Sequence, residues 1–207
     1  FLKLVERALP VESVEQNVAL VLGYMETAYW KYVSVSDRRR LADGLEQMLW
    51  QQVEASVGVS ERAAYFGAYR GIAITDAALE RLHAVWSGVA VVPGLTLTER
   101  DLTTLALELA VRGVDESEDI VRMQRDRIEN ADRQAEFEFI MNAVSADGLR
   151  RDEFFAQLTD ERNRERETWV LRGLRYLHHP IRAQRAERYL QKSLELLEEI
   201  QRTGDIF

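Results

Sequence analysis

The chain contains three histidines and no cysteine. A zinc-binding helix of the HExxH kind needs two histidines four residues apart, so that both rings reach one ion from the same helix face. His83, His178 and His179 offer no such spacing, and adjacent side chains on a helix point about 100° apart. Without cysteine, thiolate nucleophiles, disulfides and cysteine zinc sites are excluded as well. The sequence therefore contains no zinc site of a familiar kind.

A second metal motif is present only in part. Glu80 and His83 have the Glu-x-x-His spacing of di-iron bundles, which need a second such pair and two further glutamates. Arg175 stands three residues before His178, so the second pair is missing. Phosphate-binding glycine loops, dinucleotide motifs and a serine nucleophile elbow are also absent from the sequence. We expect no catalytic residue, no metal and no other cofactor in this chain.

The adjacent histidines directly precede Pro180, which indicates the end of a helix. A protonated histidine at such a place would be stabilised by the partial negative charge of the helix C-terminus. We expect this structural role for His178 and His179, and a role facing a substrate is the alternative.

The charged residues are numerous and uneven. The net charge of −8 opposes binding to nucleic acid. Residues 99–129 carry nine acids and five arginines, whereas residues 150–192 carry eleven bases and seven acids. Because arginine pairs well with carboxylates, we expect a helical surface held by ion pairs. An anion-binding face is the alternative.

Only 3 prolines and 11 glycines occur in 207 residues, which favours long helices over a strand-rich fold with many tight turns. Apolar residues recur at the spacing of three and four that is typical of amphipathic helices. Helices are predicted over 14–32, 41–53, 60–69, 75–88, 98–113, 120–128, 137–144, 154–158, 169–177 and 186–200. The short apolar stretch from Val89 to Thr96 is interrupted by Pro93 and Gly94, so we expect a buried loop there.

These helices and their short connections predict an all-α fold in a single domain over residues 1–207. The expected architecture is an α/α superhelix of about ten antiparallel helices, similar to HEAT and armadillo proteins. No apolar stretch approaches the ~20 residues that cross a bilayer. The sequence begins at Phe1 without an initiator methionine or targeting segment, so we expect a segment of a longer protein and assign no compartment.

Aromatic residues are dense in the first predicted helix. Tyr29 and Trp30 are adjacent and cannot both face one core from a single helix, so we expect one of them to line a concave surface.

Three strings resemble a known family. They are YFGAYRGIAITDAALERLHAVW over 65–86, FEFIMNAVSADGLRRDEFFAQL over 137–158 and NRERETWVLRGLRYLHHPIRA over 163–183. All three are similar to the C-terminal helical domain of bacterial zinc aminopeptidases of the aminopeptidase N family. The segment from Trp169 to Arg182 is the most specific, and one departure is Thr168, where the family pattern has proline.

The resemblance implies a helical domain without the catalytic centre. In the family the zinc helix, its third ligand and the Gly-x-Met-Glu-Asn strand lie in a preceding thermolysin-like domain. The stretch from Gly23 to Thr27 imitates that last motif but lies in an amphipathic helix and lacks the asparagine. We therefore expect Met25 in the core and Glu26 in solvent, with zinc only in the catalytic domain of the parent protein.

The resemblance also implies a role in capping the active-site chamber and controlling access of peptides. The expected partners are the catalytic domain of the same protein and peptide substrates, with no nucleic acid and no membrane span. Arginine binds a peptide carboxylate bidentately, so basic residues of the best-matching segments are the candidates for facing peptide. These candidates are Arg150, Arg151, Arg172, Arg175, His178, His179 and Arg182. The alternative function is a stand-alone helical-repeat scaffold that binds a partner protein on its concave face.

Overall fold

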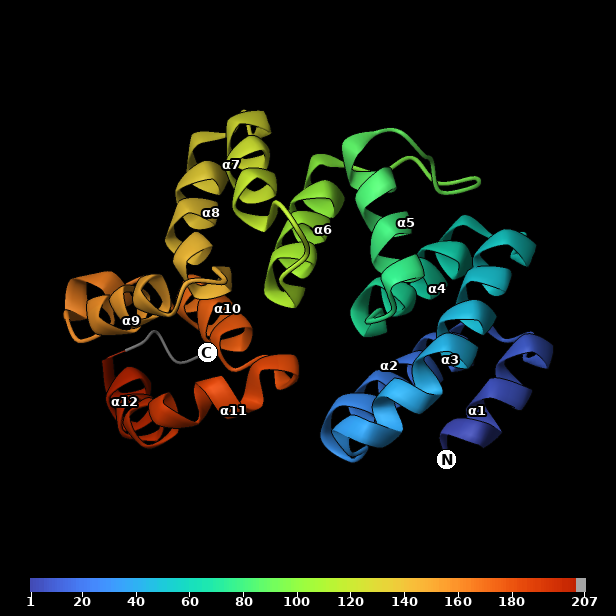
Figure 1. The fold of residues 1–207 in the computed structure, drawn as a ribbon, viewed down its shortest axis with the longest axis horizontal. Coiled ribbons are helices and arrows are strands. Elements are labelled where there is room, and N and C mark those ends of the chain that lie inside the picture. The colour runs from blue at the N-terminus through green and yellow to red at the C-terminus, as the bar shows by residue number, and fades with distance from the viewer. Residues whose placement is uncertain (204–207) are drawn as a thin grey trace. The chain divides into compact units, whose positions relative to one another are not determined.

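The computed structural model describes residues 1–203, with side chains described through residue 197. Over these residues the chain forms helices joined by short turns and loops, and no strand (Figure 1). The prediction of an all-α fold of about ten helices is therefore confirmed, and the kind of helical repeat stays a prediction. Residues 198–200, at the end of the helix predicted over 186–200, lie outside the described side chains.

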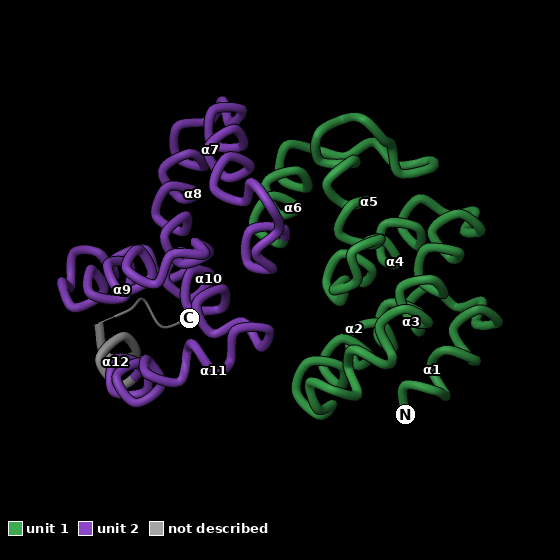
Figure 2. Tube along the Cα trace, viewed as in Figure 1, with its two compact units in different colours: residues 1–108 green, residues 109–207 purple. Residues whose placement is uncertain are grey.

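The chain divides into two compact units, residues 1–108 and 109–207, with the boundary inside one helix (Figure 2). The first unit contains α1 (Leu2–Ala8), the 3-10 turn η1 (Leu9–Val11), α2 (Glu15–Lys31), α3 (Val35–Ala55), α4 (Val59–Ile72), α5 (Asp76–Ser87) and most of α6 (Glu99–Arg112). The expectation of a single domain over residues 1–207 stays a prediction.

The second unit continues from the end of α6. It contains α7 (Ser117–Arg127), α8 (Ala131–Val144), α9 (Gly148–Gln157), η2 (Glu161–Arg164), α10 (Glu167–Leu177), η3 (Pro180–Arg182), α11 (Ala183–Ala186), η4 (Glu187–Tyr189) and α12 (Leu190–Thr203). Within this unit α8 packs against both α9 and α10. The predicted helix over 186–200 is thus divided between α11, η4 and α12.

Several helices begin and end at the predicted residues. The Thr75 hydroxyl accepts a hydrogen bond from the Ala78 amide and starts α5, which ends at Gly88 in the left-handed conformation. Thr98 and Asp101 bond reciprocally at the start of α6, as in a capping box. Residues 89–96 form a loop between these two helices, as expected. The expectation that this loop is buried is wrong, because Val89 and Val91 are exposed and only Val92 is buried.

In the first unit, α4 packs against α2 and α3, and Met25 is buried in the core while Glu26 is exposed, as predicted. The expectation for Tyr29 and Trp30 is wrong, because both side chains are buried. Trp30 donates its indole N–H to the Gly71 carbonyl at 3.0 Å and lies under the Arg38 guanidinium, 4.6 Å from the ring centroid. The contacts with Gly71 of α4 and with Arg38 of α3 therefore cover Trp30, while Tyr29 lies in the core.

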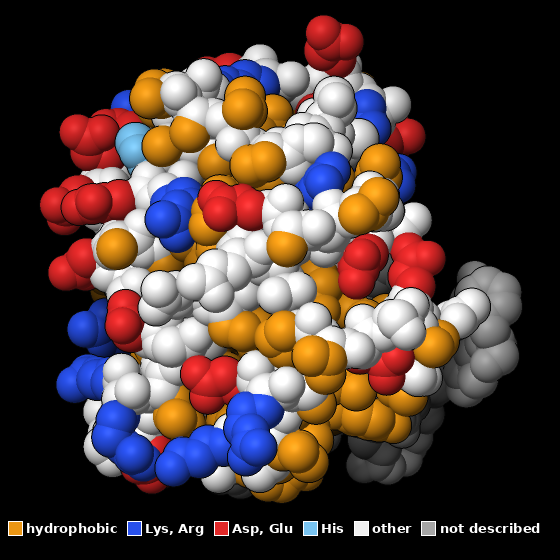
Figure 3. Space-filling model, turned by 90° about the vertical axis from the view of Figure 1, so that its right-hand side faces the viewer, with side chains coloured by type: hydrophobic (Ala, Val, Ile, Leu, Met, Phe, Trp, Pro, Cys, Tyr) orange, Lys and Arg blue, Asp and Glu red, His pale blue; other side chains and the backbone are white. Residues whose placement is uncertain are grey.

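On one face of the molecule, acidic, basic and hydrophobic side chains are interspersed (Figure 3). Ion pairs such as Arg40 with Asp37 at 2.8 Å occur on exposed helix faces, as the sequence predicts. None of the described helices is long and apolar enough to cross a lipid bilayer.

Candidate functional site

The seven basic residues predicted to face peptide all lie in the second unit. Arg150 and Arg151 belong to α9, Arg172 and Arg175 to α10, and Arg182 to η3. His178 and His179 form the connection between α10 and η3.

Arg151 and Arg182 are buried and bind backbone carbonyls. Both guanidinium groups donate to the Ser145 carbonyl, Arg151 at 2.5 Å and Arg182 at 2.9 Å. Arg182 also donates to the Ala110 carbonyl at 2.7 Å. Burial, and next the charge of Arg151, lower the pKa of Arg182 to about 10. These two arginines connect the end of α6, the α8–α9 connection and η3. Their guanidinium groups therefore stabilise the fold.

Arg150 and Arg172 form ion pairs with carboxylates of other helices. Arg150 Nη1 lies 2.8 Å from Glu118 Oε2, and Arg172 Nη1 lies 2.9 Å from Glu136 Oε1. The other oxygen of Glu118 accepts a hydrogen bond from the Ser145 hydroxyl at 2.6 Å. The positive charges of Arg150 and Arg172 are thus partly neutralised by Glu118 and Glu136.

Arg175 differs from these four. Its side chain is exposed, and it makes no ion pair with any residue that the structure describes. Of the arginines predicted to face peptide, Arg175 is therefore the one whose guanidinium is available to a ligand carboxylate. A peptide-facing role for the seven residues stays a prediction.

The two histidines lie at the end of α10, as predicted, but burial lowers the pKa of His178 and disfavours its protonated form. Burial of His178 therefore outweighs the stabilisation that a helix terminus would give to its protonated form. His178 Nε2 instead lies 2.8 Å from the Ser193 hydroxyl on α12. His179 accepts a hydrogen bond from the Ile181 amide through Nδ1 at 3.3 Å and caps η3.

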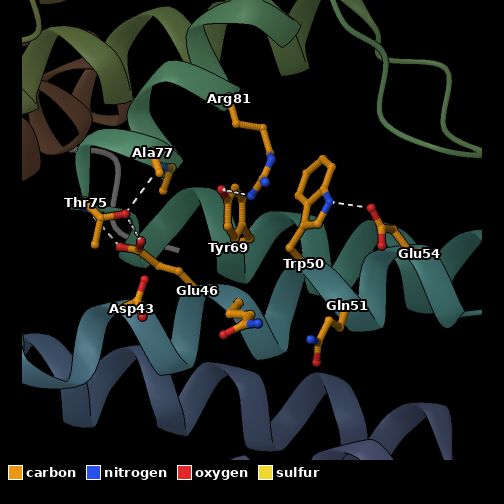
Figure 4. A pocket seen from close by; sticks show the side chains of 11 residues that line it. Asp43, Glu46, Trp50, Gln51, Glu54, Tyr69, Thr75, Ala77 and Arg81 are labelled. Carbon is orange, nitrogen blue, oxygen red and sulfur yellow. Dashed lines mark hydrogen bonds between the residues drawn. The ribbon is translucent and has the colours of Figure 1, made fainter.

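A cavity of about 510 Å³ lies in the first unit between α3, the C-terminal end of α4 and α5 (Figure 4). This volume is within the range of small-molecule sites. Its lining residues are Asp43, Glu46, Gln47, Trp50, Gln51, Glu54, Tyr69, Thr75, Ala77, Ala78 and Arg81. No group of three His, Asp or Glu side chains in the described part of the chain could hold a metal ion.

The aromatic part of the cavity is built around Arg81. Its guanidinium carbon lies 4.6 Å from the centroid of the Trp50 ring, and Nη1 donates to the Tyr69 hydroxyl at 3.0 Å. Trp50 and Tyr69 are themselves in contact, with ring centroids 5.1 Å apart. Burial raises the pKa of Tyr69, and the hydrogen bond from Arg81 opposes that shift. These contacts fix the orientation of the indole and the guanidinium.

The acidic part of the cavity has one buried and two exposed carboxylates. Glu46 is buried, and its Oε1 accepts hydrogen bonds from the amides of Ile74 and Thr75 at 2.7 and 3.2 Å. The Thr75 hydroxyl donates to Oε2 of the same carboxylate. Glu54 is exposed and accepts from the Trp50 indole at 2.6 Å, and Asp43 is exposed.

The sequence did not identify this cavity. One signal for it exists, since Asp43, Glu46, Trp50 and Glu54 recur at spacings of three and four along α3 and share one face. Their partner Arg81 is on another helix, and only the packing of α5 brings it to the cavity. Nothing local in the sequence separates these three acids from the other 32 of the chain's 35.

No protein-family model matches the sequence, and no curated protein matches it.

Proposed function

We propose that this chain is a non-catalytic C-terminal helical domain of a zinc aminopeptidase, which packs on the catalytic domain and limits which peptides reach the zinc. The observation that carries this proposal is the resemblance of the strings over 65–86, 137–158 and 163–183 to that domain of the family. The all-α fold supports it, because the family domain is also helical.

The contacts within the strings support the same proposal. Arg151 and Arg182 bind the Ser145 carbonyl, and Gly173 lies directly against the Phe154 ring. These residues stand in the two strings of strongest resemblance, and each has a structural reason for its type.

Arg175 is the residue through which we propose contact with the carboxylate of a peptide substrate. In the parent enzyme, Arg175→Ala is expected to raise KM for peptides several-fold and to leave short chromogenic amides unaffected, since these lack the distal carboxylate. Arg185→Ala is the matched control, because Arg185 is also an exposed arginine of the second unit. Equal KM values for Arg175→Ala and the parent would overturn this contact.

A stand-alone helical scaffold that binds a partner protein is the second candidate function. The cavity between α3 and α5 favours it, because the cavity combines fixed aromatic rings with exposed carboxylates. The two functions predict different sequences for the complete gene product that contains this chain. The peptidase proposal requires an HExxH helix before Phe1, and the scaffold does not.

A further inference from the structure

We infer that the cavity between α3 and α5 binds an arginine or lysine side chain of a basic peptide segment, and it would do so in either of the functions above. The inference depends on the volume of the cavity, on its charge and on the geometry of its aromatic residues. None of the residues that line this cavity is among the seven residues predicted from the sequence to face peptide.

The cavity follows one face of α3. From Asp43 to Glu54 this face extends over twelve residues, or about 16 Å along the helix axis. An extended peptide covers that length with about five residues. The order along the face is acidic at Asp43 and Glu46, aromatic at Trp50 and acidic again at Glu54 (Figure 4).

The charge of the lining residues selects a cation. Three carboxylates and one guanidinium line the cavity, which leaves a formal charge of −2 at neutral pH. A phosphate or a carboxylate ligand would approach two exposed acidic groups, so this charge disfavours it. A bare metal ion is also disfavoured, because no three ligating side chains converge in the described part of the chain.

The two exposed carboxylates are free to receive the cation. Glu54 Oε1 is bonded to the Trp50 indole, whereas its Oε2 has no hydrogen-bond partner among the described residues. Asp43 makes no hydrogen bond or ion pair with any described residue. The buried Glu46 is held by Ile74 and Thr75, so it supplies charge from the floor of the cavity and positions the α4–α5 connection.

The aromatic residues suit the apolar stem of a long basic side chain. Lysine and arginine lay their methylene groups on apolar surface while the charged head reaches polar groups. Arg81 already places its guanidinium over one face of the Trp50 ring, 4.6 Å from the centroid, and its hydrogen bond to Tyr69 keeps it there. The contacts with Arg81 and Glu54 thus fix the indole between the two acidic ends of the cavity.

The test uses the whole chain and peptides that differ in one group. The probe is acetyl-Gly-Gly-Arg-Gly-Gly-amide, whose blocked ends leave the guanidinium as its single charge. The comparison peptides carry lysine, neutral citrulline or glutamate in place of arginine. Binding is followed through the indole N–H signal of Trp50 in the NMR spectrum, which reports on the cavity because that group bonds to Glu54.

We expect the arginine and lysine peptides to shift the Trp50 signal in a saturable manner, and the citrulline and glutamate peptides to leave it unchanged. Asp43→Asn and Glu54→Gln should each weaken binding about three- to fivefold, and together about tenfold or more. Added salt should weaken it further. Glu15→Gln is the matched control, since Glu15 is an exposed acid of the same unit outside the cavity and its variant should bind as the parent does.

Two results would overturn the inference. One is equal binding of the arginine and citrulline peptides to the parent protein, which needs no variant and so does not depend on how a variant folds. The other is a double variant with an intact thermal transition that still binds the arginine peptide as tightly as the parent. Failure of the gene product to act as a peptidase would leave both results as they stand, which keeps the two tests distinct.

Discussion

At the scale of single residues, Gly173 determines how closely α10 approaches α9. It is buried, and a Cβ atom at this position would overlap the Phe154 ring. We expect Gly173→Ala to lower the free energy of unfolding by about 1–3 kcal/mol, because overpacking outweighs the better helix propensity of alanine. Urea denaturation of the whole chain measures the difference.

Gly23 provides the matched control for that substitution. It lies in the helical interior of α2, and a Cβ atom there would meet no atom within 4 Å. Gly23→Ala should therefore stabilise the chain by about 0.5–1 kcal/mol. If both substitutions changed stability in the same direction, the contact between Gly173 and Phe154 would not have the importance assigned to it.

His178 makes stability depend on pH. Its Nδ1 is buried without a hydrogen-bond partner among the described residues, and burial lowers its pKa below the ordinary 6.5. The unfolded chain therefore takes up the proton first as pH falls below 6.5, and the folded state loses stability until the pH passes the folded pKa. This loss amounts to at most about 1.4 kcal/mol per pH unit for one proton.

Replacing the His178 side chain should reduce the dependence of stability on pH. Between pH 7.5 and 5.5, urea denaturation should show a smaller loss of stability for His178→Gln than for the parent. The carboxylates titrate alike in both proteins. The difference between their slopes of unfolding free energy against pH therefore measures the contribution of His178. Identical slopes would show that burial of His178 does not control its protonation.

At the scale of secondary-structure elements, Arg182 holds three segments together. Its hydrogen bonds to Ser145 and Ala110 connect η3 to the α8–α9 connection and to the end of α6. We expect Arg182→Ala to cost about 2–4 kcal/mol, because two buried carbonyls lose charged donors. Exposed Arg185→Ala should stay within about 0.5 kcal/mol of the parent, and a similar cost for both variants would contradict this role.

The elements that the sequence predicted best are those with local signals. The caps at Thr75 and Thr98 and the left-handed Gly88 depend on a few consecutive residues, and all three are where the sequence placed them. The start of α4 was predicted at Ser60 and lies at Val59. Burial of both Tyr29 and Trp30 could not be predicted, because Trp30 is covered by Gly71 and Arg38, which belong to other helices.

The candidate site was predicted less well than the elements, for the same reason. An arginine in the sequence is equally suited to a carbonyl, a carboxylate or a ligand, and only tertiary packing distinguishes buried Arg182 from exposed Arg175. The cavity residues of α3 share a face that the sequence reveals, whereas Arg81 reaches them through the packing of α5. Electrostatic sites formed by separate helices are thus harder to predict than caps.

At the scale of the whole molecule, helical periodicity was sufficient to predict the fold class, since it recurs along nearly the entire chain. It was not sufficient to predict the division into two compact units. The boundary between residues 108 and 109 lies inside α6, where the sequence has no linker, proline or change of composition.

We propose that this chain is the non-catalytic helical domain of a zinc aminopeptidase. The most direct measurement is release of amino-terminal residues from peptides by the complete gene product and by residues 1–207 alone. We predict that the complete product is active, loses activity on chelation and regains it with zinc, while residues 1–207 are inactive. A complete product that releases no amino-terminal residues, or whose activity is indifferent to chelation, would contradict the claim.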